Sequence, residues 1–264
     1  MNNDSKGGVL SMVVKPMNRQ QIQSIEHVYQ PIWKLDTWDV FGYEALLRLP
    51  DTAMNHNIES VLEQARVDDS LYELDTMSIF WAIQCFPFHQ LKSVRLFINV
   101  FPSTLLHDNF ESFINQTLQR YPQAKGKIVF ELSETRHEHH IWRFHELKEK
   151  ISFLKENQFQ IALNDIGKEA ATFEKINEFS PDIIKLDRYF ARDLSTSREK
   201  QHMVSYLIEF EKQGILLILE GIEEAIDLAS AKLLRVPAAQ GYLLGHPEKI
   251  PNLYSWRRCL SLPE

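Results

Sequence analysis

The sequence predicts an α/β fold, a TIM-like (β/α)8 barrel in which one strand runs antiparallel because it belongs to an N-terminal hairpin. Eight strand-like apolar runs occur along the chain, and segments with helical spacing lie between most of them. Such alternation indicates a largely parallel sheet, because parallel neighbours need a crossover connection. The first two runs are separated only by the short segment KLDTWDVF, which predicts the hairpin. A doubly wound open sheet is the alternative, but it usually has fewer strands and no opening hairpin.

Each predicted element can be placed on the chain. The strand-like runs are 24–35, 39–49, 93–100, 127–134, 159–166, 182–187, 215–222 and 238–245. The segments with helical spacing are 58–86, 102–121, 140–157, 169–179, 198–213 and 223–235. We expect one domain over residues 23–264, preceded by a flexible or weakly helical extension over residues 1–22.

Composition and charge narrow the possible functions. The chain has 264 residues, 44% of them hydrophobic, so one large domain can bury a sizeable core. A formal net charge of −7 lacks the basic footprint of a DNA- or RNA-binding protein. The apolar stretches are only strand-length, and the first residues do not read as a secretion signal, so no membrane partner is expected. Two distant cysteines, Cys85 and Cys259, fit a reducing compartment, and we expect a cytoplasmic protein.

Polar residues occur where the predicted strands end. They are Glu44, Asn99, Glu131, Asn164, Asp165, Lys185, Asp187, Glu220, Glu223 and Gln240. Functional residues of an α/β barrel gather at the C-terminal ends of its strands, so these side chains are expected to surround one mouth. Their oxygen atoms favour a hard cation such as Mg²⁺ or Mn²⁺. A single acid at a strand end is more often a helix cap or a solvated loop residue, but recurrence on several strands favours a site.

A series of short motifs carries a resemblance to a known family. In chain order they are YQPIWKL, GYEALLR, FINVFP, FELSET, LNDIG, PDIIKLDRYF, LEGIEE and QGYLLGHP. With this order and spacing the chain resembles the EAL domain, the cyclic di-GMP phosphodiesterase module of bacterial signalling. The resemblance covers roughly residues 23–262, and Glu44-Ala45-Leu46 matches the signature tripeptide. The tripeptide alone is a weak signal, whereas the ordered set is specific.

The resemblance implies a role for each matched position. Positions that would hold one or two divalent cations, Mg²⁺ or Mn²⁺, are Glu44, Asn99, Glu131, Asn164 and Asp165. Glu220 would serve as general base or ligand of the second cation, and Lys185 would orient the attacking water and offset phosphate charge. Positions that would contact the ligand are Gln30, Leu46, Arg48 and Gln240. Supporting positions are Glu134, which would anchor a loop, Asp187 and Glu223.

The implied reaction is hydrolysis of one phosphodiester bond of cyclic di-GMP, which gives linear pGpG. It proceeds by two-metal activation of water and in-line displacement. Members of the family often pair through helices beside the barrel mouth, so the resemblance implies a homodimer. A protein partner is a further possibility for which the sequence carries no motif.

Two departures from the family pattern bear on this reaction. The family has an Asp that bridges both cations where this chain has Asn164, whose amide offers one oxygen acceptor and no charge. Two cations about 3.5–4 Å apart repel each other, and a shared carboxylate usually screens them. The following loop, GKEAAT over residues 167–172, also lacks the family's Gly-Thr-Gly-Tyr-Ser-Ser type run. A helix that starts early in this alanine-rich stretch is the expected consequence.

Three hypotheses therefore remain open at the level of sequence. The first is a stand-alone cyclic di-GMP domain with weak or lost hydrolysis, favoured by Asn164 and the altered loop beside intact Gln30 and Arg48. The second is an active metal-dependent phosphodiesterase, favoured by the other matching positions. The third is a protein-binding regulator that does not need the nucleotide.

Overall fold

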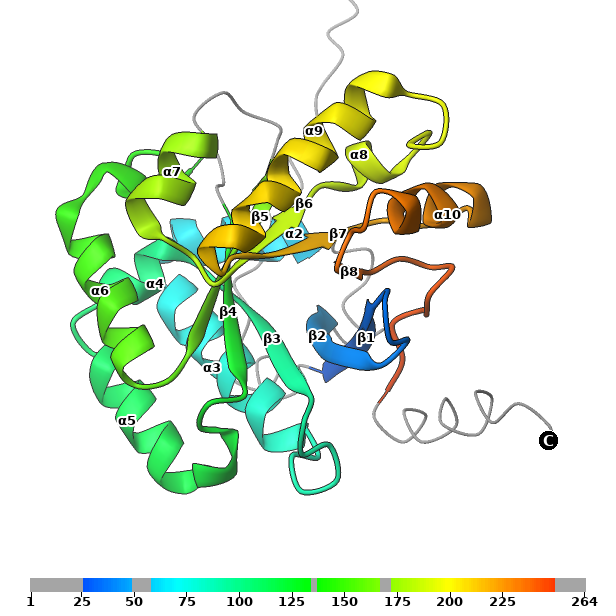
Figure 1. Cartoon of the computed structure of the whole chain (residues 1–264). Coiled ribbons are helices and arrows are strands. Elements are labelled where there is room, and N and C mark those ends of the chain that lie inside the picture. Colours follow the sequence, from blue (N-terminus) through cyan, green and yellow to red (C-terminus); the bar gives the residue numbers. More distant parts are fainter. Residues whose placement is uncertain (1–25, 49–57, 134–136, 167–171, 250–264) are drawn as a thin grey trace, which may run out of the picture.

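The barrel and its surrounding helices are seen in a computed structural model that describes residues 26–48, 58–133, 137–166 and 172–249. Eight strands close into one barrel in chain order, and helices cover its outside (Figure 1). The predicted TIM-like (β/α)8 architecture is confirmed. The predicted extension over residues 1–22 lies outside the described residues.

The elements have the following bounds. The strands are β1 (Glu26–Lys34), β2 (Val40–Arg48), β3 (Arg95–Val100), β4 (Ile128–Leu132), β5 (Gln160–Ile166), β6 (Ile183–Leu186), β7 (Leu216–Leu219) and β8 (Ala238–Ala239). The α-helices are α2 (Ile58–Val67), α3 (Leu71–Cys85), α4 (Pro102–Leu106), α5 (Phe110–Arg120), α6 (His145–Glu156), α7 (Thr172–Phe179), α8 (Arg188–Ala191), α9 (Arg198–Ile208) and α10 (Ala225–Leu233). Short 3-10 helices are η1 (Pro122–Ala124), η2 (Ile141–Arg143) and η3 (Glu209–Gln213).

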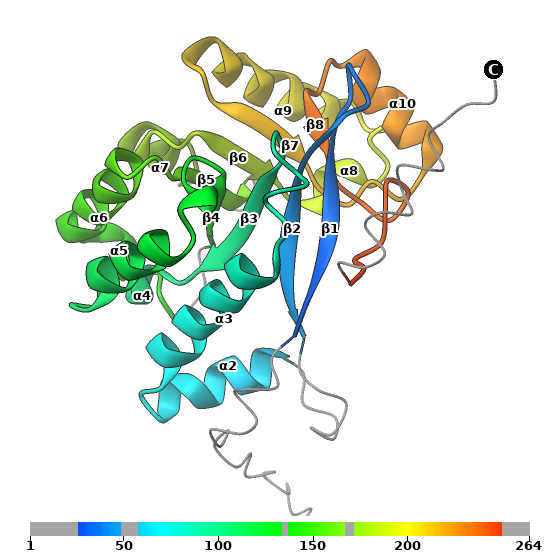
Figure 2. The same ribbon diagram turned by 90° about the horizontal axis from the view of Figure 1, so that it is seen from below.

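β1 is the antiparallel strand of the barrel. It pairs antiparallel with β2 on one side and with β8 on the other. The remaining neighbouring pairs, from β2·β3 to β7·β8, are parallel. Figure 2 shows β1 and β2 lying side by side along their length. The predicted N-terminal hairpin and its single antiparallel strand are therefore confirmed.

A layer of buried apolar side chains fills the barrel interior, and each strand contributes one of them. This floor layer consists of Ile32, Phe41, Phe97, Val129, Ala162, Ile183, Ile218 and Ala238. Because side chains alternate between the two faces of a strand, the residues between these positions point outward to the helices. Leu96 and Ile98 of β3, for example, belong to the larger core between sheet and helices. The floor layer packs the barrel, so its interior is not a pore.

β2 carries one extra residue, which changes the phase of its side chains. Ile32 pairs with Gly42, but the next residue of β1, Trp33, pairs with Val40, so Phe41 is left without a partner. Such a bulge places two consecutive residues on the same face. Gly42 accordingly faces inward beside Phe41, where an added Cβ would lie 2.5 Å from the Phe97 ring.

Several predicted elements differ from the structure: the segment 102–121 divides into α4 and α5, for example, and 140–157 contains η2 and α6. The segment 58–86 forms two helices, α2 and α3, because Asp69 adopts a left-handed φ of 55° between them. The last predicted strand shortens to Ala238–Ala239 because the chain turns at Gly241, whose missing side chain lets it pass against the backbone of Ile222. None of the helices in the described part of the chain has the length and apolarity needed to cross a bilayer.

Candidate active site

A ring of polar side chains lies directly above the floor layer, at the end of the barrel where the parallel strands have their C-termini. Its members are Gln30, Glu44, Asn99, Glu131, Asn164, Lys185, Glu220 and Gln240. On β3 to β8 each stands two residues after the floor-layer residue, as strand alternation requires. Glu220 and Gln240 directly follow β7 and β8. This mouth ring brings together eight positions that the sequence placed in one site.

Lys185 occupies the centre of the mouth ring and is fully buried. Its ammonium nitrogen Nζ lies 2.7 and 2.8 Å from the two carboxylate oxygens of Glu131. Nζ also lies 2.7 Å from Glu220 Oε1 and 3.1 Å from Glu44 Oε2. One cation thus stabilises three carboxylates that would otherwise repel one another.

This crowding shifts the acidity of all four groups. Burial alone lowers the pKa of Lys185, but the charges of Glu131, Glu220 and Glu44 raise it well above its usual value. Burial and the neighbouring carboxylates raise the pKa of Glu131 well above its usual value. Burial also raises the pKa of Glu220. The pKa of Glu44 is lowered, because Lys185 and hydrogen bonds outweigh its burial. The lysine therefore stays charged, and it is the cation that offsets the mutual repulsion of the three carboxylates.

Two glutamines extend the ring toward β1. Gln240 Nε2 donates to Glu44 Oε2 at 2.8 Å and to Gln30 Oε1 at 3.0 Å. Gln30 Nε2 in turn donates to the Gly245 carbonyl at 3.0 Å. Within the described chain, the buried Gln240 Oε1 accepts no hydrogen bond, so it has room for one donor at the mouth.

Asn164 uses both ends of its amide inside the protein. Nδ2 donates to Glu131 Oε2 at 3.3 Å, and Oδ1 accepts from the Asp165 backbone N–H at 2.8 Å. Asp165 has a left-handed φ of 58°, and the pairing of β5 with β6 shifts between Leu163 and Ile166. The polypeptide therefore bends at this pair of residues, and Asn164 is held against Glu131.

The oxygen atoms of the ring are of the chemical type that binds a divalent cation. Carboxylate oxygens of Glu44, Glu131 and Glu220, with amide oxygens beside them, are the hard ligands that Mg²⁺ and Mn²⁺ prefer. Across the residues that the structure describes, however, no cluster of three or more Asp, Glu, His or Cys side chains is arranged around a common metal position. The carboxylates instead converge on Lys185. Binding a cation would require some of them to turn away from the ammonium group.

The outer ligand positions line one side of the mouth. Arg48, at the end of β2, is exposed and donates from Nη1 to the Leu47 carbonyl at 2.9 Å. Arg48 and Leu46 line a hollow of about 350 Å³ between the ends of β2 and β3 and helices α2 and α3. We call this hollow the slot. Asn99 links it to the ring, because its Nδ2 donates to Glu44 Oε1 at 3.3 Å.

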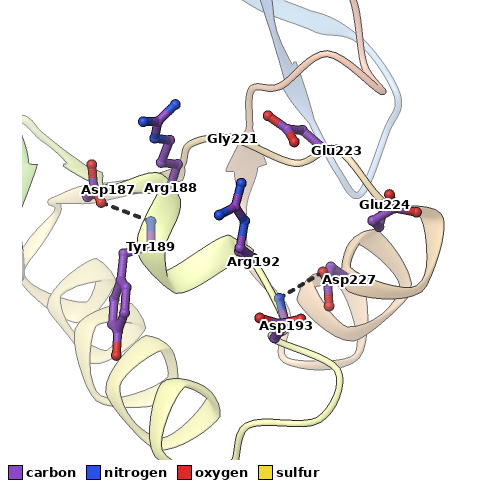
Figure 3. A pocket seen from close by; sticks show the side chains of 9 residues that line it. All are labelled: Asp187, Arg188, Tyr189, Arg192, Asp193, Gly221, Glu223, Glu224 and Asp227. Atoms are coloured by element: carbon purple, nitrogen blue, oxygen red, sulfur yellow. Dashed lines mark hydrogen bonds between the residues drawn. The ribbon is translucent and has the colours of Figure 1, made fainter.

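Asp187 and Glu223 do not line the slot. They line a second hollow of about 470 Å³ between α8 and α10. Asp187 caps α8 by accepting the Tyr189 N–H at 2.9 Å. Figure 3 shows Arg188 and Arg192 extending toward the side of the hollow on which Glu223 lies. The predicted loop anchor Glu134 and the loop residues 167–171 lie outside the described residues.

Sequence reasoning missed several residues beside the mouth. Asp75, within α3, is buried, and Glu138 is buried in the segment before η2. Arg66, in the last turn of α2, forms an ion pair with Glu138. Asp75 could have been noticed as an acid among apolar residues of a helix. Glu138 and Arg66 carried no local signal, because their partners are distant in the sequence.

The fold and the ring define an α/β barrel protein that keeps its chemistry at the C-terminal ends of its strands. Within that class, residues 17–247 match the family model described as the EAL domain, and the chain belongs to the EAL domain family. The family expectation from the motifs is confirmed.

Individual relatives agree with this placement. The chain is 25% identical to the cyclic di-GMP phosphodiesterase PdeF of Escherichia coli over 248 residues, which are 90% of this chain and 32% of PdeF. It spans less than two thirds of the length of the curated relatives it matches.

Two solved structures share the fold. The first is BlrP1 of Klebsiella pneumoniae in a manganese and cyclic di-GMP complex, with a TM-score of 0.75, 22% identity, and coverage of 86% of this chain and 56% of that one. The second is the FimX EAL domain of Pseudomonas aeruginosa bound to cyclic di-GMP, with a TM-score of 0.76, 23% identity, and coverage of 87% and 94%.

Proposed function

We propose that this chain binds cyclic di-GMP at the mouth of its barrel and hydrolyses it weakly or not at all. Membership of the EAL family, and the ligand present in the BlrP1 and FimX structures, support this choice of ligand. The exposed Arg48 beside the slot is suited to bidentate contact with a phosphate group. Gln30, Leu46 and Gln240 complete the set of ligand contacts in this proposal.

The contact between Asn164 and Glu131 carries the second half of the proposal. An Asp at this position would bring a second negative charge to within about the same 3.3 Å of Glu131 Oε2, and that arrangement needs a cation between the two groups. The Asn164 amide needs none, because it donates a hydrogen bond to the carboxylate. The substitution therefore removes a charge and a metal-bridging oxygen at the same time.

Divalent cations remain part of the proposed site. Glu44, Asn99, Glu131 and Asp165 would hold Mg²⁺ or Mn²⁺, which when bound polarises the phosphate and lowers the pKa of a water molecule. Glu220 is the base that accepts the water proton, and Lys185 holds the Glu220 carboxylate in place at 2.7 Å. With Asn164 in place we expect fewer cations to be retained, and turnover to fall with them.

Calorimetric titration of the protein with cyclic di-GMP, in Ca²⁺ buffer and again with EDTA, tests the binding. Saturable binding in Ca²⁺ buffer supports the proposal, and its absence in both buffers overturns it. Glu44→Ala is the site variant for comparison, because it removes a partner of Lys185, Gln240 and Asn99 together.

An active phosphodiesterase is the second candidate function, favoured by the assembled Glu44, Glu131, Lys185 and Glu220. It predicts release of linear pGpG in Mg²⁺ or Mn²⁺ that Glu44→Ala abolishes. If the missing bridging charge is the defect, Asn164→Asp should raise turnover by about 10- to 100-fold, the usual scale for a change at a metal site. The exposed Asn115→Asp on α5 adds the same charge elsewhere and should leave turnover unchanged.

A nucleotide-independent protein-binding regulator is the third hypothesis. It predicts that a partner captured by the wild-type protein is captured equally by Glu44→Ala and with cyclic di-GMP absent. Loss of capture in either condition argues against it.

A further inference from the structure

Helix α4 starts directly after β3, and distant carboxylates cap its first turn. The Phe101 N–H donates to Asp75 Oδ2 at 2.9 Å, and the Ser103 N–H donates to Glu138 Oε2 at 3.2 Å. Pro102 between them has no N–H to satisfy. Phe101, at the N-cap position, has no side chain able to cap the helix. Asp75 lies 26 positions before Phe101 in the sequence, and Glu138 lies 35 positions after Ser103. The end of β3 is thus fixed by residues from distant parts of the chain.

Glu138 also binds the helix that precedes α3. Its Oε1 accepts from Ser103 Oγ at 2.7 Å and from Arg66 Nη2 at 3.1 Å, and only 3% of Glu138 is exposed. The Arg66 guanidinium lies over the Phe101 ring, 4.7 Å from its centroid. One buried carboxylate therefore joins α2, the start of α4 and the segment before η2. We call this set of contacts the clamp.

Among the described residues, the buried side chains of helix α2 belong to a small cluster. Its buried residues, Val61 and Ala65, form a small cluster with Leu71 and Leu74 of α3 that is separate from the main core. Leu47 and Phe101 pack against that cluster. A small cluster holds a helix loosely in comparison with a continuous core, so the ion pair of the clamp weighs more in fixing α2.

The position of α2 decides the shape of the slot. Ile58 and Leu62 of α2 form one wall, and Leu46, Arg48, Asn99 and Phe101 lie around the rest. The slot is mostly apolar at its walls, and Asn99 connects it to Glu44 of the mouth ring. A shift of α2 therefore changes the width of the space beside the proposed ligand contacts Leu46 and Arg48.

We propose that Glu138 is a positioning residue for ligand binding, which sets the width of the slot by clamping α2 to the start of α4. Glu138 does not line the slot or belong to the mouth ring, so it acts through Arg66 and Ser103. The inference rests on the proposed binding of cyclic di-GMP at the mouth. Glu138 would thus influence ligand binding without touching the ligand.

Three variants separate this role from a general loss of stability. Glu138→Gln keeps the shape of the side chain but removes its charge, so both Arg66 and Ser103 lose their charged acceptor. Arg66→Met frees α2 while leaving the cap on Ser103. Glu111→Gln is the matched control, because Glu111 pairs with Lys150 at 2.6 Å between α5 and α6, away from the slot.

The measurements are amide hydrogen exchange without ligand and calorimetry with cyclic di-GMP, both on the full chain at a temperature where each variant is folded. We expect Glu138→Gln and Arg66→Met to lower the protection of α2 amides and to weaken binding by about tenfold or more, the scale reported for residues that orient a site. Protection of the Ser103 amide should fall in Glu138→Gln alone. Glu111→Gln should change neither binding nor α2.

Contrary outcomes can be told apart. Wild-type protein that binds cyclic di-GMP, together with a Glu138→Gln variant that binds equally well, overturns the positioning role. Unchanged α2 protection in both clamp variants overturns it too, whatever happens to affinity. Failure of the wild-type protein itself to bind overturns the proposed function, and the positioning role falls with it.

Discussion

The two ends of the barrel interior solve the same packing problem by different means. In the floor layer each strand contributes an apolar residue, from Ile32 to Ala238, and shape alone fills the space. One layer above it, the mouth ring lies across the barrel interior with amides, carboxylates and Lys185, each two residues after the floor-layer residue on β3 to β8. The same strand backbone therefore supports an apolar layer and a polar layer equally well. Stability at the floor depends on volume, whereas stability at the mouth depends on every charge having its partner.

Lys185→Met should show the largest effect at the mouth. The substitution keeps most of the volume but leaves Glu44, Glu131 and Glu220 without their shared cation. We expect the free energy of unfolding to fall by about 3–5 kcal/mol at pH 7, the cost of breaking a buried ion pair from one side. Urea unfolding measures it. The loss should shrink at lower pH, where the carboxylates become protonated, and Lys212→Met, on an exposed lysine, should cost almost nothing.

Asp75→Asn tests whether buried polar groups make the mouth end depend on pH. Burial raises the pKa of Asp75 from its ordinary value of 3.8 to about 7. The folded state then holds the proton up to about pH 7 while the unfolded state releases it near its ordinary pKa. The stability contributed by Asp75 is therefore present in acid and is lost as the pH rises from about 4 to about 7.

The variant cannot titrate at this position, so its unfolding free energy lacks this term. The difference between wild type and Asp75→Asn should change by as much as about 4 kcal/mol across that range, in the sense of wild type losing stability as the pH rises. Denaturant unfolding at several pH values measures it. A difference that stays constant with pH would contradict the assignment.

Gly241→Ala tests the close approach of two backbone segments that positions Gln240 of the mouth ring. A Cβ at Gly241 would lie 2.1 Å from the Ile222 carbonyl oxygen and 2.3 Å from its nitrogen, so the neighbouring Gln240 would have to move. We expect a loss of about 1–3 kcal/mol, measured by urea unfolding, because the clash is with backbone. Gly214 has a φ of 83° and no atom within 4 Å of an added Cβ, so Gly214→Ala isolates the cost of backbone conformation alone. Equal losses in the two variants would argue against the close approach.

Ile218→Val should have the smallest effect and defines the behaviour of the floor. It removes one buried methyl group from the floor layer, and we expect a loss of about 0.5–1.5 kcal/mol. The loss should be the same at pH 5 and pH 8, as followed by thermal or urea unfolding. Any strong pH dependence would mean that the two ends of the interior are coupled, and the comparison would need revision.

The sequence predicted the barrel well because its repeating signals are local. Alternation of apolar residues within each run and the short segment between the first two runs contain the strand count and the hairpin. Helix ends and the last strand were less predictable. The break at Asp69 depends on one left-handed residue, and the shortening of β8 depends on the approach of Gly241 to Ile222.

The site was predictable to the extent that it follows from strand position. Ring members such as Asn99, Glu131 and Lys185 stand near the ends of parallel strands, where alternation alone directs them to one mouth. Their pairing was not predictable, since the convergence of three carboxylates on Lys185 requires the closed barrel. The clamp could not be predicted for the same reason, because Arg66 and Glu138 are separated by 72 positions and meet only after folding.

The bulge at Phe41 in β2 decides which changes of sequence the site can accept without losing its geometry. Because that extra residue sets the phase of the strand, Glu44 points into the barrel rather than toward the helices. A side chain in the ring can be exchanged while its direction is kept, as the proposed variant Asn164→Asp would do. Gain or loss of one residue within a strand would reverse every later side chain of that strand. Single substitutions can therefore change the chemistry of the mouth, whereas an insertion or deletion within a strand would turn its later side chains away from the mouth.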